Sequence, residues 1–391
     1  MKKTISILGS TGSVGISSFD IFDKKKNLFK FNVLAADKNL KSICKQINKY
    51  KPEIFIINNK KVLKKVKKKY QYKKIKIIHN SEVDQYNFKR SDITIAAIPG
   101  IAGLKPTLKL LKKSKKILIA NKESIICGWN LIKSEASKNN TKIIPIDSEH
   151  FSIMKLLENQ KIQDIKKIYL TASGGPFLKF TVSQLRNIKP NQALKHPKWK
   201  MGKKISIDSA TLMNKLLEFV EAQKLFSIAE NKIKIVIHPE SLVHAVIELK
   251  NGIYKFIYHK TTMVIPLANA IFNDDVEITK FLKPKLNNDK KIFFKNLNFQ
   301  EVNEKKFPII KLKSRINEYN STPIIINAIN EILVDQFLKK KIAFNSFYKL
   351  ILLVLKDRNY KKYAIKVPKN INQVLMIDHW SRKTTYEKIK K

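Results

Sequence analysis

The chain has 391 residues, of which 43% are hydrophobic, and this is enough for two or three globular domains with their own cores. A formal net charge of +47 is typical of nucleic-acid binders, but the lysines are spread over almost every segment and no nucleic-acid-binding module is recognisable. Two cysteines exclude a disulfide framework and a thiolate zinc site, and no apolar run is long enough to span a membrane. Because a strand pattern follows Met1 almost directly, we expect no signal peptide and a cytoplasmic protein, or the mature form of an imported one.

The chain begins with a pattern typical of dinucleotide-binding folds. Residues 4–8 (TISIL) have the pattern of a buried strand, and the glycine-rich stretch GSTGSVG at 9–15 follows directly. A helix is predicted to begin inside this stretch and to run to about Phe22. Because glycines let backbone N–H groups approach a pyrophosphate at the positive end of a helix, we expect a nucleotide cofactor here.

A second strand, predicted at 31–36, ends where such folds contact the ribose of the cofactor. Asp37 favours a free 2′-hydroxyl, whereas Lys38 and Asn39 favour a 2′-phosphate. These neighbouring residues therefore give conflicting indications of NADH or NADPH use.

Further apolar segments alternate with lysine-rich helical patterns, which predicts a doubly wound, Rossmann-like α/β sheet. The additional strands are expected at 54–57, 75–78, 93–98, 117–120 and 142–146. Ligands of such sheets bind beyond the carboxyl ends of the strands. Polar or glycine-rich groups follow three of the strands, at 99–103, 121–124 and 147–150, although any one of them could serve only as a helix cap.

Carboxylates near the end of this region predict a metal site. Asp147 and Glu149 are two apart in what should be extended chain, so their side chains are expected on the same side. Glu218, from a later helix, would complete an all-oxygen set. Oxygen ligands suit Mg²⁺ or Mn²⁺ and argue against a structural zinc site.

The densest group of chemically useful side chains lies between residues 193 and 221. A basic, aromatic loop leads through the apolar run 205–207 to Asp208 and Ser209, which predict a helix start. On the helix that follows, Asn214 and Glu218 share one side and Lys215 stands about 100° around the axis. The alternative interpretation is that Lys215 and Glu218 form an exposed pair on the helix surface.

The rest of the chain adds a turn, an antiparallel pair and a helical end. A helix is expected near 151–157 and a strand at 167–171, followed by the turn 172–177, whose hydroxyl and free backbone amides suit a phosphate. Further strands are predicted at 233–237, 244–249 and 254–259; the last two should pair around Asn251-Gly252 and could also mediate subunit pairing. Residues 280–305 have weak periodicity and predict a linker, and helices are expected from Phe307 onward, including 323–338 and 344–355.

Several motifs occur together in a fixed order: GSTGSVG at 9, ANKES at 120, DSEH at 147, ASGGPF at 172, HPKWKMG at 196, DSATLMNKLLE at 208, HPES at 238 and NAINE at 327. With these motifs, the chain resembles the 1-deoxy-D-xylulose-5-phosphate reductoisomerase family nearly from end to end. The resemblance implies NADPH- and metal-dependent rearrangement and reduction of 1-deoxy-D-xylulose 5-phosphate to 2-C-methyl-D-erythritol 4-phosphate. This reaction belongs to the non-mevalonate pathway of isoprenoid biosynthesis.

The resemblance also implies roles for individual residues. The ligands of Mg²⁺ or Mn²⁺ would be Asp147, Glu149 and Glu218, which together with Lys122 would be the catalytic residues. The substrate-binding residues would be Lys122, Ser148, Glu149, Ser173, His196, Ser209, Asn214, Lys215 and Glu218. The NADPH-binding residues would be Thr11, Gly12, Ser13, Val14, Lys38, Asn39, Asn121, Glu123 and Gly202. Trp199 and Met201 would close over the site.

The implied architecture is a homodimer of multidomain α/β chains, without a specific nucleic-acid or membrane partner. We expect a Rossmann-like NADPH-binding domain at 1–147, a central α+β catalytic domain at 148–279 with a mobile lid near 196–204, a linker at 280–305 and a C-terminal helical bundle at 306–391. The alternatives are a related Rossmann-fold dehydrogenase of another phosphorylated substrate and a basic nucleic-acid-binding protein.

Three departures from the usual family pattern bear on function. Asp37 stands where the family usually has glycine, which bears on the preference for NADPH over NADH. Leu216 replaces a small residue in the helix that carries Lys215 and Glu218. The segment 261–266 lacks the usual acidic and arginine residues before its proline, so subunit contacts or lid support are expected to differ.

Overall fold

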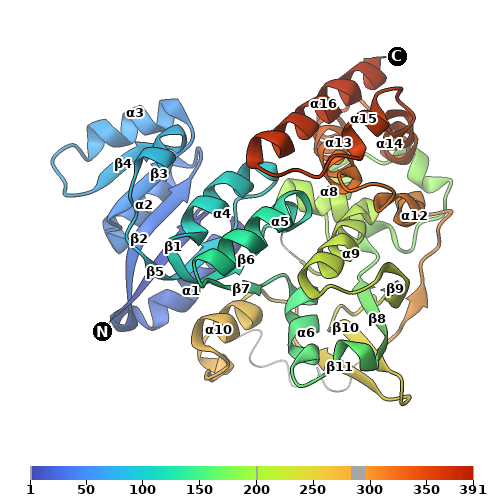
Figure 1. The fold of residues 1–391 in the computed structure, drawn as a ribbon, viewed down its shortest axis with the longest axis horizontal. Coiled ribbons are helices and arrows are strands. Elements are labelled where there is room, and N and C mark those ends of the chain that lie inside the picture. The colour runs from blue at the N-terminus through green and yellow to red at the C-terminus, as the bar shows by residue number, and fades with distance from the viewer. Residues whose placement is uncertain (1, 200, 283–295, 391) are drawn as a thin grey trace. The chain divides into compact units, whose positions relative to one another are not determined.

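The structure is a computed structural model that describes residues 2–199, 201–282 and 296–390, and it divides into two compact units (Figure 1). The first unit contains the described residues of Met1–Ser124, Asn130–Asp147 and Met263–Lys290. The second contains the described residues of Ile125–Trp129, Ser148–Thr262 and Lys291–Lys391.

The first unit is built on a parallel sheet of seven strands in the order β4-β3-β2-β1-β5-β6-β7. The strands are β1 (Lys3–Leu8), β2 (Phe29–Ala36), β3 (Ile54–Ile57), β4 (Lys76–His79), β5 (Ser91–Ala96), β6 (Ser114–Ile119) and β7 (Lys142–Pro145). The strand order reverses beside β1, which is the switch point where doubly wound sheets bind ligands. The predicted strands and the predicted fold class are thus confirmed, with small shifts at the strand ends.

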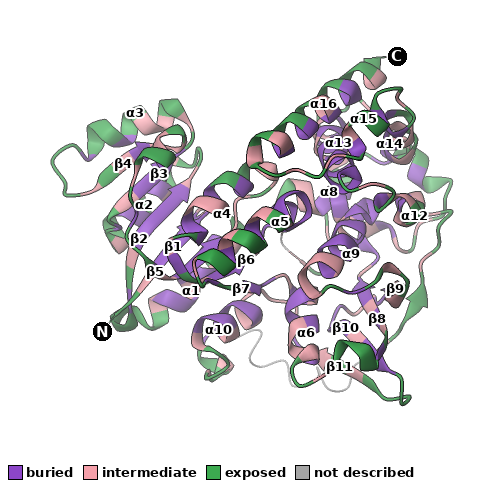
Figure 2. Ribbon diagram, viewed as in Figure 1, coloured by how far each residue is buried: buried purple, intermediate pink, exposed green. Residues whose placement is uncertain are grey.

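Helices alternate with these strands along the chain. They are α1 (Ser13–Lys24), α2 (Leu40–Tyr50), α3 (Lys60–Lys69), α4 (Leu104–Leu111), α5 (Lys122–Lys138) and, from later in the chain, α10 (Val264–Phe272), which packs on α1. The middle strands are buried on both faces, as their continuous apolar runs require, whereas α3 buries only Val66 and presents its lysines to solvent (Figure 2). Much of the positive charge therefore lies on solvated helix surfaces.

The second unit has a mixed sheet in the order β11-β10-β8-β9-β12. Its strands are β8 (Ile165–Ala172), β9 (Ile233–Ile237), β10 (Val243–Leu249), β11 (Tyr254–Tyr258) and β12 (Gln300–Glu301). The predicted antiparallel pairing of the two strands around Asn251-Gly252 is confirmed. Helix α6 (Ser148–Leu157) packs on β10 and β11, and the helices α7 (Pro190–Ala193), α8 (Lys203–Thr211) and α9 (Met213–Phe226) follow β8 in the chain.

The C-terminal residues are helical, as predicted. The helices are α12 (Lys313–Ile316), α13 (Thr322–Leu338), α14 (Phe347–Leu355), α15 (Tyr360–Ala364) and α16 (Ile371–Lys390). The apolar helix α13 is buried along most of its length because α14 and α16 pack against it. Within the predicted linker, residues 283–295 lie outside the described part, and Gln300–Glu301 form strand β12 rather than irregular chain. None of the described helices is both long and apolar enough to cross a membrane.

Two predictions about local structure are wrong. Asp208 and Ser209 do not begin a helix, because they lie inside α8, whose N-cap is Gly202. The apolar run 205–207 is part of this helix, and Leu212, in the left-handed conformation (φ 62°), separates α8 from α9. Asp208 instead accepts a hydrogen bond from Asn330 of α13 at 2.7 Å, a long-range contact that local sequence does not reveal.

The second error concerns the residues after β7. This strand ends at Pro145 and α6 begins at Ser148, so Glu149 lies in the first helical turn and not in extended chain. The alternation of side chains in a strand therefore does not explain how Asp147 and Glu149 come together. The start of the helix holds both side chains: Asp147 directly precedes α6, and Glu149 lies in its first turn.

Candidate active site

Three carboxylates gather where the sequence predicts a metal site. Asp147 directly precedes α6, Glu149 lies in its first turn, and Glu218 comes from α9. One oxygen from each of the three lies within 4.8 Å of the others. Such a set of carboxylate oxygens fits a hard divalent cation such as Mg²⁺ or Mn²⁺.

Two buried ammonium groups accompany these carboxylates. Lys122 Nζ lies 2.9 Å from Asp147 Oδ2, and Lys215 Nζ lies 2.8 Å from Glu149 Oε1 and also pairs with Glu218. Burial alone would lower the pKa of Lys215, but attraction to Glu149 and Glu218 outweighs it and raises the pKa. Lys215 is therefore a positive charge next to the carboxylate group.

The exposed-pair interpretation of Lys215 and Glu218 is wrong. The two side chains form an i,i+3 pair, but they are only 5% and 1% exposed. Asn214 also donates to Glu218 through its side-chain amide, so the predicted sharing of one helix side is confirmed. Removing one partner of a buried charge pair costs much more free energy than removing one partner of a surface pair, because the other charge stays buried without its partner.

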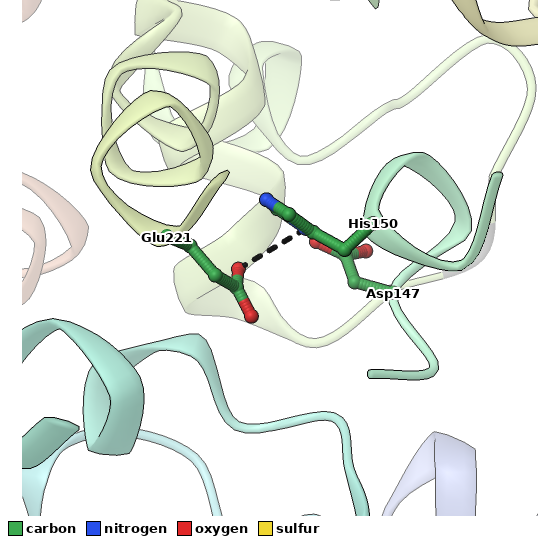
Figure 3. A group of neighbouring side chains, drawn as sticks. All are labelled: Asp147, His150 and Glu221. Atoms are coloured by element: carbon green, nitrogen blue, oxygen red, sulfur yellow. Dashed lines mark ion pairs between the residues drawn. The ribbon is translucent and has the colours of Figure 1, made fainter. Parts of the chain in front are cut away.

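A second group shares Asp147 with the first and adds His150 and Glu221, to which sequence reasoning gave no role. Figure 3 shows Asp147, His150 and Glu221, whose ligand atoms also lie within 4.8 Å of one another. His150 Nε2 lies 3.0 Å from the backbone oxygen of Glu218, and since a carbonyl only accepts, Nε2 carries a proton. The other ring nitrogen, Nδ1, faces Glu221 Oε2 at 3.3 Å (Figure 3).

The His150–Glu221 pair therefore connects α6 to α9 beside Asp147 of the carboxylate group. His150 and Glu221 are both buried, at 0% and 1% exposure of their side chains. One signal could have found them: Glu221 follows Glu218 by three residues on one helix, and His150 is adjacent to Glu149 in sequence.

A second cluster of predicted residues forms around the turn after β8. Ser173 Oγ lies 3.0 Å from His196 Nε2 and accepts a hydrogen bond from the backbone N–H of Gly175. Gly174 and Gly175 have positive φ values of 80° and 65°. A Cβ atom on Gly175 would lie 2.8 Å from the backbone oxygen of Ser209, so glycine lets the turn approach Ser209 in α8.

The protonation state of His196 follows from its contacts. Its Nδ1 accepts from the backbone N–H groups of Lys198 and Trp199, at 3.1 and 2.9 Å, so the proton of the neutral ring sits on Nε2. Burial, and then repulsion from Lys215, lower the pKa of His196 to about 4. His196 is therefore a neutral hydrogen-bond donor near pH 7.

The predicted lid is described except for residue 200. The Trp199 ring lies edge-on to His244 with ring centres 6.2 Å apart, and His244 stacks on His259 at 4.0 Å. Gly202 is the N-cap of α8, so residues 203–204 of the predicted lid are helical.

The predicted cofactor residues of the first turn come together at the N-terminus of α1. Gly12 caps this helix, and Thr11, Ser13 and Val14 adjoin it. A Cβ atom would lie 2.5 Å from the backbone oxygen of Ala97 if added to Gly9, and 2.6 Å from two backbone oxygens if added to Gly15. The backbone N–H groups of Gly9, Ser10 and Gly12 donate to backbone oxygens of Ala35 and Gly9. A phosphate at this turn would therefore meet the first N–H groups of α1, which have no partner within the helix.

Four of the other predicted cofactor residues follow strands of the same sheet, whereas Gly202 caps α8 in the second unit. Asn121 uses its side chain internally: it caps α5 and donates to the backbone oxygens of Ile98 and Gly100. Glu123, in the first turn of α5, is buried, whereas Lys38 and Asn39 are exposed after β2, with Asn39 capping α2.

The fold and the carboxylate group together define the class of this protein: a dinucleotide-binding, metal-dependent oxidoreductase. Comparison with known sequences specifies it further. Family models match residues 5–128 (1-deoxy-D-xylulose 5-phosphate reductoisomerase), 143–226 (1-deoxy-D-xylulose 5-phosphate reductoisomerase C-terminal domain) and 260–384 (DXP reductoisomerase C-terminal domain). The chain belongs to the 1-deoxy-D-xylulose 5-phosphate reductoisomerase family.

Individual relatives cover almost the whole chain. The reductoisomerase of Pelagibacter ubique (strain HTCC1062) is 41% identical over 377 residues, which are 95% of this chain and 96% of the relative. A crystal structure of DOX-P reductoisomerase in complex with NADPH, fosmidomycin and magnesium aligns with a TM-score of 0.90 and 30% identity, covering 99% of this chain and 98% of that one. The enzyme from Zymomonas mobilis in complex with NADPH aligns with a TM-score of 0.87 and 28% identity over both full chains.

Proposed function

We propose that this chain catalyses the NADPH- and divalent-metal-dependent conversion of 1-deoxy-D-xylulose 5-phosphate to 2-C-methyl-D-erythritol 4-phosphate, in the non-mevalonate route to isoprenoid precursors. The observation that carries this proposal is the gathering of Asp147, Glu149 and Glu218 beside two buried lysines. A relative of known structure binds NADPH, magnesium and fosmidomycin, which supports the same ligand classes here.

Asp147, Glu149 and Glu218 would hold Mg²⁺ or Mn²⁺. When bound, the ion supplies Lewis-acid stabilisation of negative charge on substrate oxygens. Lys122, paired with Asp147, and Ser148, which donates to Glu149 at 2.6 Å, would bind and orient the oxygenated carbons of the substrate. Lys122 is only 6% exposed, so its charge acts in a medium that screens it less than water does.

The phosphate of the substrate would bind to the cluster around the turn after β8. The proposed ligands are Ser173, His196, Ser209, Asn214 and Lys215. A neutral His196 can donate a hydrogen bond to the dianion without changing its own charge, and Lys215 supplies the positive charge. Closure of Trp199 and Met201 over the bound phosphate would exclude water from the reacting carbons.

NADPH would bind at the carboxyl end of the parallel sheet. The proposed contacts are Thr11, Gly12, Ser13, Val14, Lys38, Asn39, Asn121, Glu123 and Gly202. The pyrophosphate would lie at the N-terminus of α1, and Lys38 and Asn39 would lie near the ribose.

The chain would act as a cytoplasmic homodimer, without specific nucleic-acid or membrane partners. Strand β11 supports self-association, because it lies at an edge of its sheet and exposes Tyr254 and Phe256, each more than half exposed. Within each chain, the NADPH-binding domain would comprise residues 1–147 and the catalytic domain residues 148–279. Residues 280–305 would be a linker, and residues 306–391 the C-terminal helical domain. Light scattering coupled to gel filtration tests the dimer: a mass near 45.3 kDa at micromolar concentration would contradict it.

The reaction is tested by following NADPH absorbance with purified protein, Mn²⁺ or Mg²⁺ and 1-deoxy-D-xylulose 5-phosphate. We expect turnover that a chelator abolishes and added metal restores. Turnover that survives the chelator would favour a dehydrogenase of another type, because the carboxylates would then have no ion to hold. If the metal-loaded protein shows neither turnover nor substrate binding, the proposal is overturned.

A further inference from the structure

Asp37 occupies a position that bears on coenzyme choice. It follows the last residue of β2, next to the strand whose glycine turn begins α1, and it is exposed. In dinucleotide folds, an acidic residue at this strand end hydrogen-bonds the free 2′-hydroxyl of NADH, whereas a cation there accommodates the 2′-phosphate of NADPH.

The contacts of Asp37 hold its carboxylate at the strand ends. Asn58, which directly follows β3, donates through its side chain to Asp37 Oδ1 at 3.2 Å. The backbone oxygen of Asn58 in turn lies 2.8 Å from Nε2 of His79, at the end of β4. These contacts link the ends of three adjacent strands. Because the amide of Asn58 is neutral, its contact with Asp37 leaves the negative charge uncancelled.

The neighbouring residues only partly offset this charge. Lys38 is exposed and supplies one positive charge. The side-chain oxygen of Asn39 is engaged as the cap of α2, accepting from the backbone N–H of Ser42 at 3.1 Å. One carboxylate and one ammonium therefore stand side by side where the 2′-phosphate would approach, so their net attraction for that dianion is small.

We propose that Asp37 is a specificity-determining residue that weakens discrimination between the two coenzymes, so that this reductoisomerase binds NADH and NADPH with similar affinity. The inference rests on the proposed function only in assuming that a nicotinamide dinucleotide binds at this sheet. A carboxylate several ångströms from a phosphate dianion in a water-like medium weakens binding by about tenfold. Asp37 does not repel NADH in this way, because its carboxylate can accept a hydrogen bond from the 2′-hydroxyl of that coenzyme.

The test is direct binding of NADPH and NADH to the full chain, followed by energy transfer from protein tryptophan to the reduced nicotinamide, without substrate or metal. In Asp37→Asn, which preserves a hydrogen-bonding side chain, we expect NADPH to bind about tenfold more tightly and NADH to change by less than about threefold. Lys38→Ala should weaken NADPH and leave NADH nearly unchanged. The matched control is Glu53→Gln, which removes an exposed carboxylate at the opposite end of β3 and should alter neither affinity.

Two outcomes would overturn the proposal: a wild-type preference for NADPH greater than about a hundredfold, or an affinity ratio in both Asp37→Asn and Asp37→Ala that stays within twofold of wild type. Matching thermal midpoints would show that the variants are folded. Because the readout is binding, absence of turnover with 1-deoxy-D-xylulose 5-phosphate would overturn the proposed reaction and leave the role of Asp37 standing.

Discussion

Replacing Glu218 with glutamine tests the carboxylate group with the smallest change of shape. The side chain is 1% exposed, receives a hydrogen bond from Asn214 and pairs with Lys215. Glu218 is one of three grouped carboxylates, with Asp147 and Glu149, and Lys122 and Lys215 pair with members of this group. Glutamine at this position removes one negative charge and one anionic ligand while preserving the side-chain volume.

The expected effect on metal affinity is large. A unit charge pair 4 Å apart contributes about 4 kcal/mol at an effective dielectric constant of 20, and a divalent ion doubles the attraction before desolvation is subtracted. A net loss of at least about 3 kcal/mol corresponds to more than a hundredfold weaker Mn²⁺ binding. We expect kcat/KM to fall at least as much, and NADPH affinity to stay within about twofold, because the predicted cofactor residues do not include Glu218.

Mn²⁺ affinity can be measured by electron paramagnetic resonance of the free ion, NADPH affinity by energy transfer, and turnover by NADPH absorbance. Glu158→Gln, which removes an exposed carboxylate just after α6, is the control and should match wild type in all three. Unchanged Mn²⁺ affinity in Glu218→Gln would refute the assignment of this carboxylate to the metal. Equal loss of Mn²⁺ and NADPH binding would instead mean that the substitution disturbs the fold.

Three further predictions concern neighbouring groups. Gly175→Ala should lower the thermal midpoint more than Gly252→Ala. Both glycines have positive φ, where an alanine is strained by about 1–2 kcal/mol, but only at Gly175 would the added Cβ also lie 2.8 Å from a backbone oxygen. Equal thermal midpoints of the two variants would contradict this. In the folded protein the pKa of His196 is about 4, below its ordinary value of 6.5. The free energy of unfolding of wild type, measured with urea, should therefore fall relative to that of His196→Asn as the pH drops from about 6.5 to 4. Parallel pH profiles for the two proteins would argue against a neutral His196 ring. His150→Gln keeps a donor for the backbone oxygen of Glu218 but loses the contact with Glu221. If that contact positions the carboxylates, Mn²⁺ affinity should fall about tenfold with little change in NADPH affinity. Unchanged Mn²⁺ affinity would show that His150 has no positioning role.

Patterns of short range allowed much of the fold to be predicted. The apolar runs of β1, β3 and β9 and the glycines at 9–15 encode strands and a turn whatever surrounds them. The ordered motifs indicated the family, and the relatives confirm this prediction together with the reaction class and the cofactor classes. The roles of individual site residues stay predictions, although the structure brings Asp147, Glu149 and Glu218 together.

One of the two errors arose where a long-range contact holds a residue in place. Asp208 looks like a helix cap to its neighbours in sequence, but Asn330, 122 residues further on, holds it inside α8. The break at Leu212 similarly separates two helices that a continuous periodicity would join. Helix propensity and capping are weak local preferences, and packing overrides them.

By itself, the sequence determined the order of strands and helices, the glycine turn before α1, the family and the types of side chain available for chemistry. Only the tertiary structure decided that Lys215 and Glu218 are buried and not a surface pair, and that His150 and Glu221 connect α6 to α9 beside Asp147. The physical reason is that the energy of a charge depends on its distance from other charges and from water, and residues far apart in the chain set both distances.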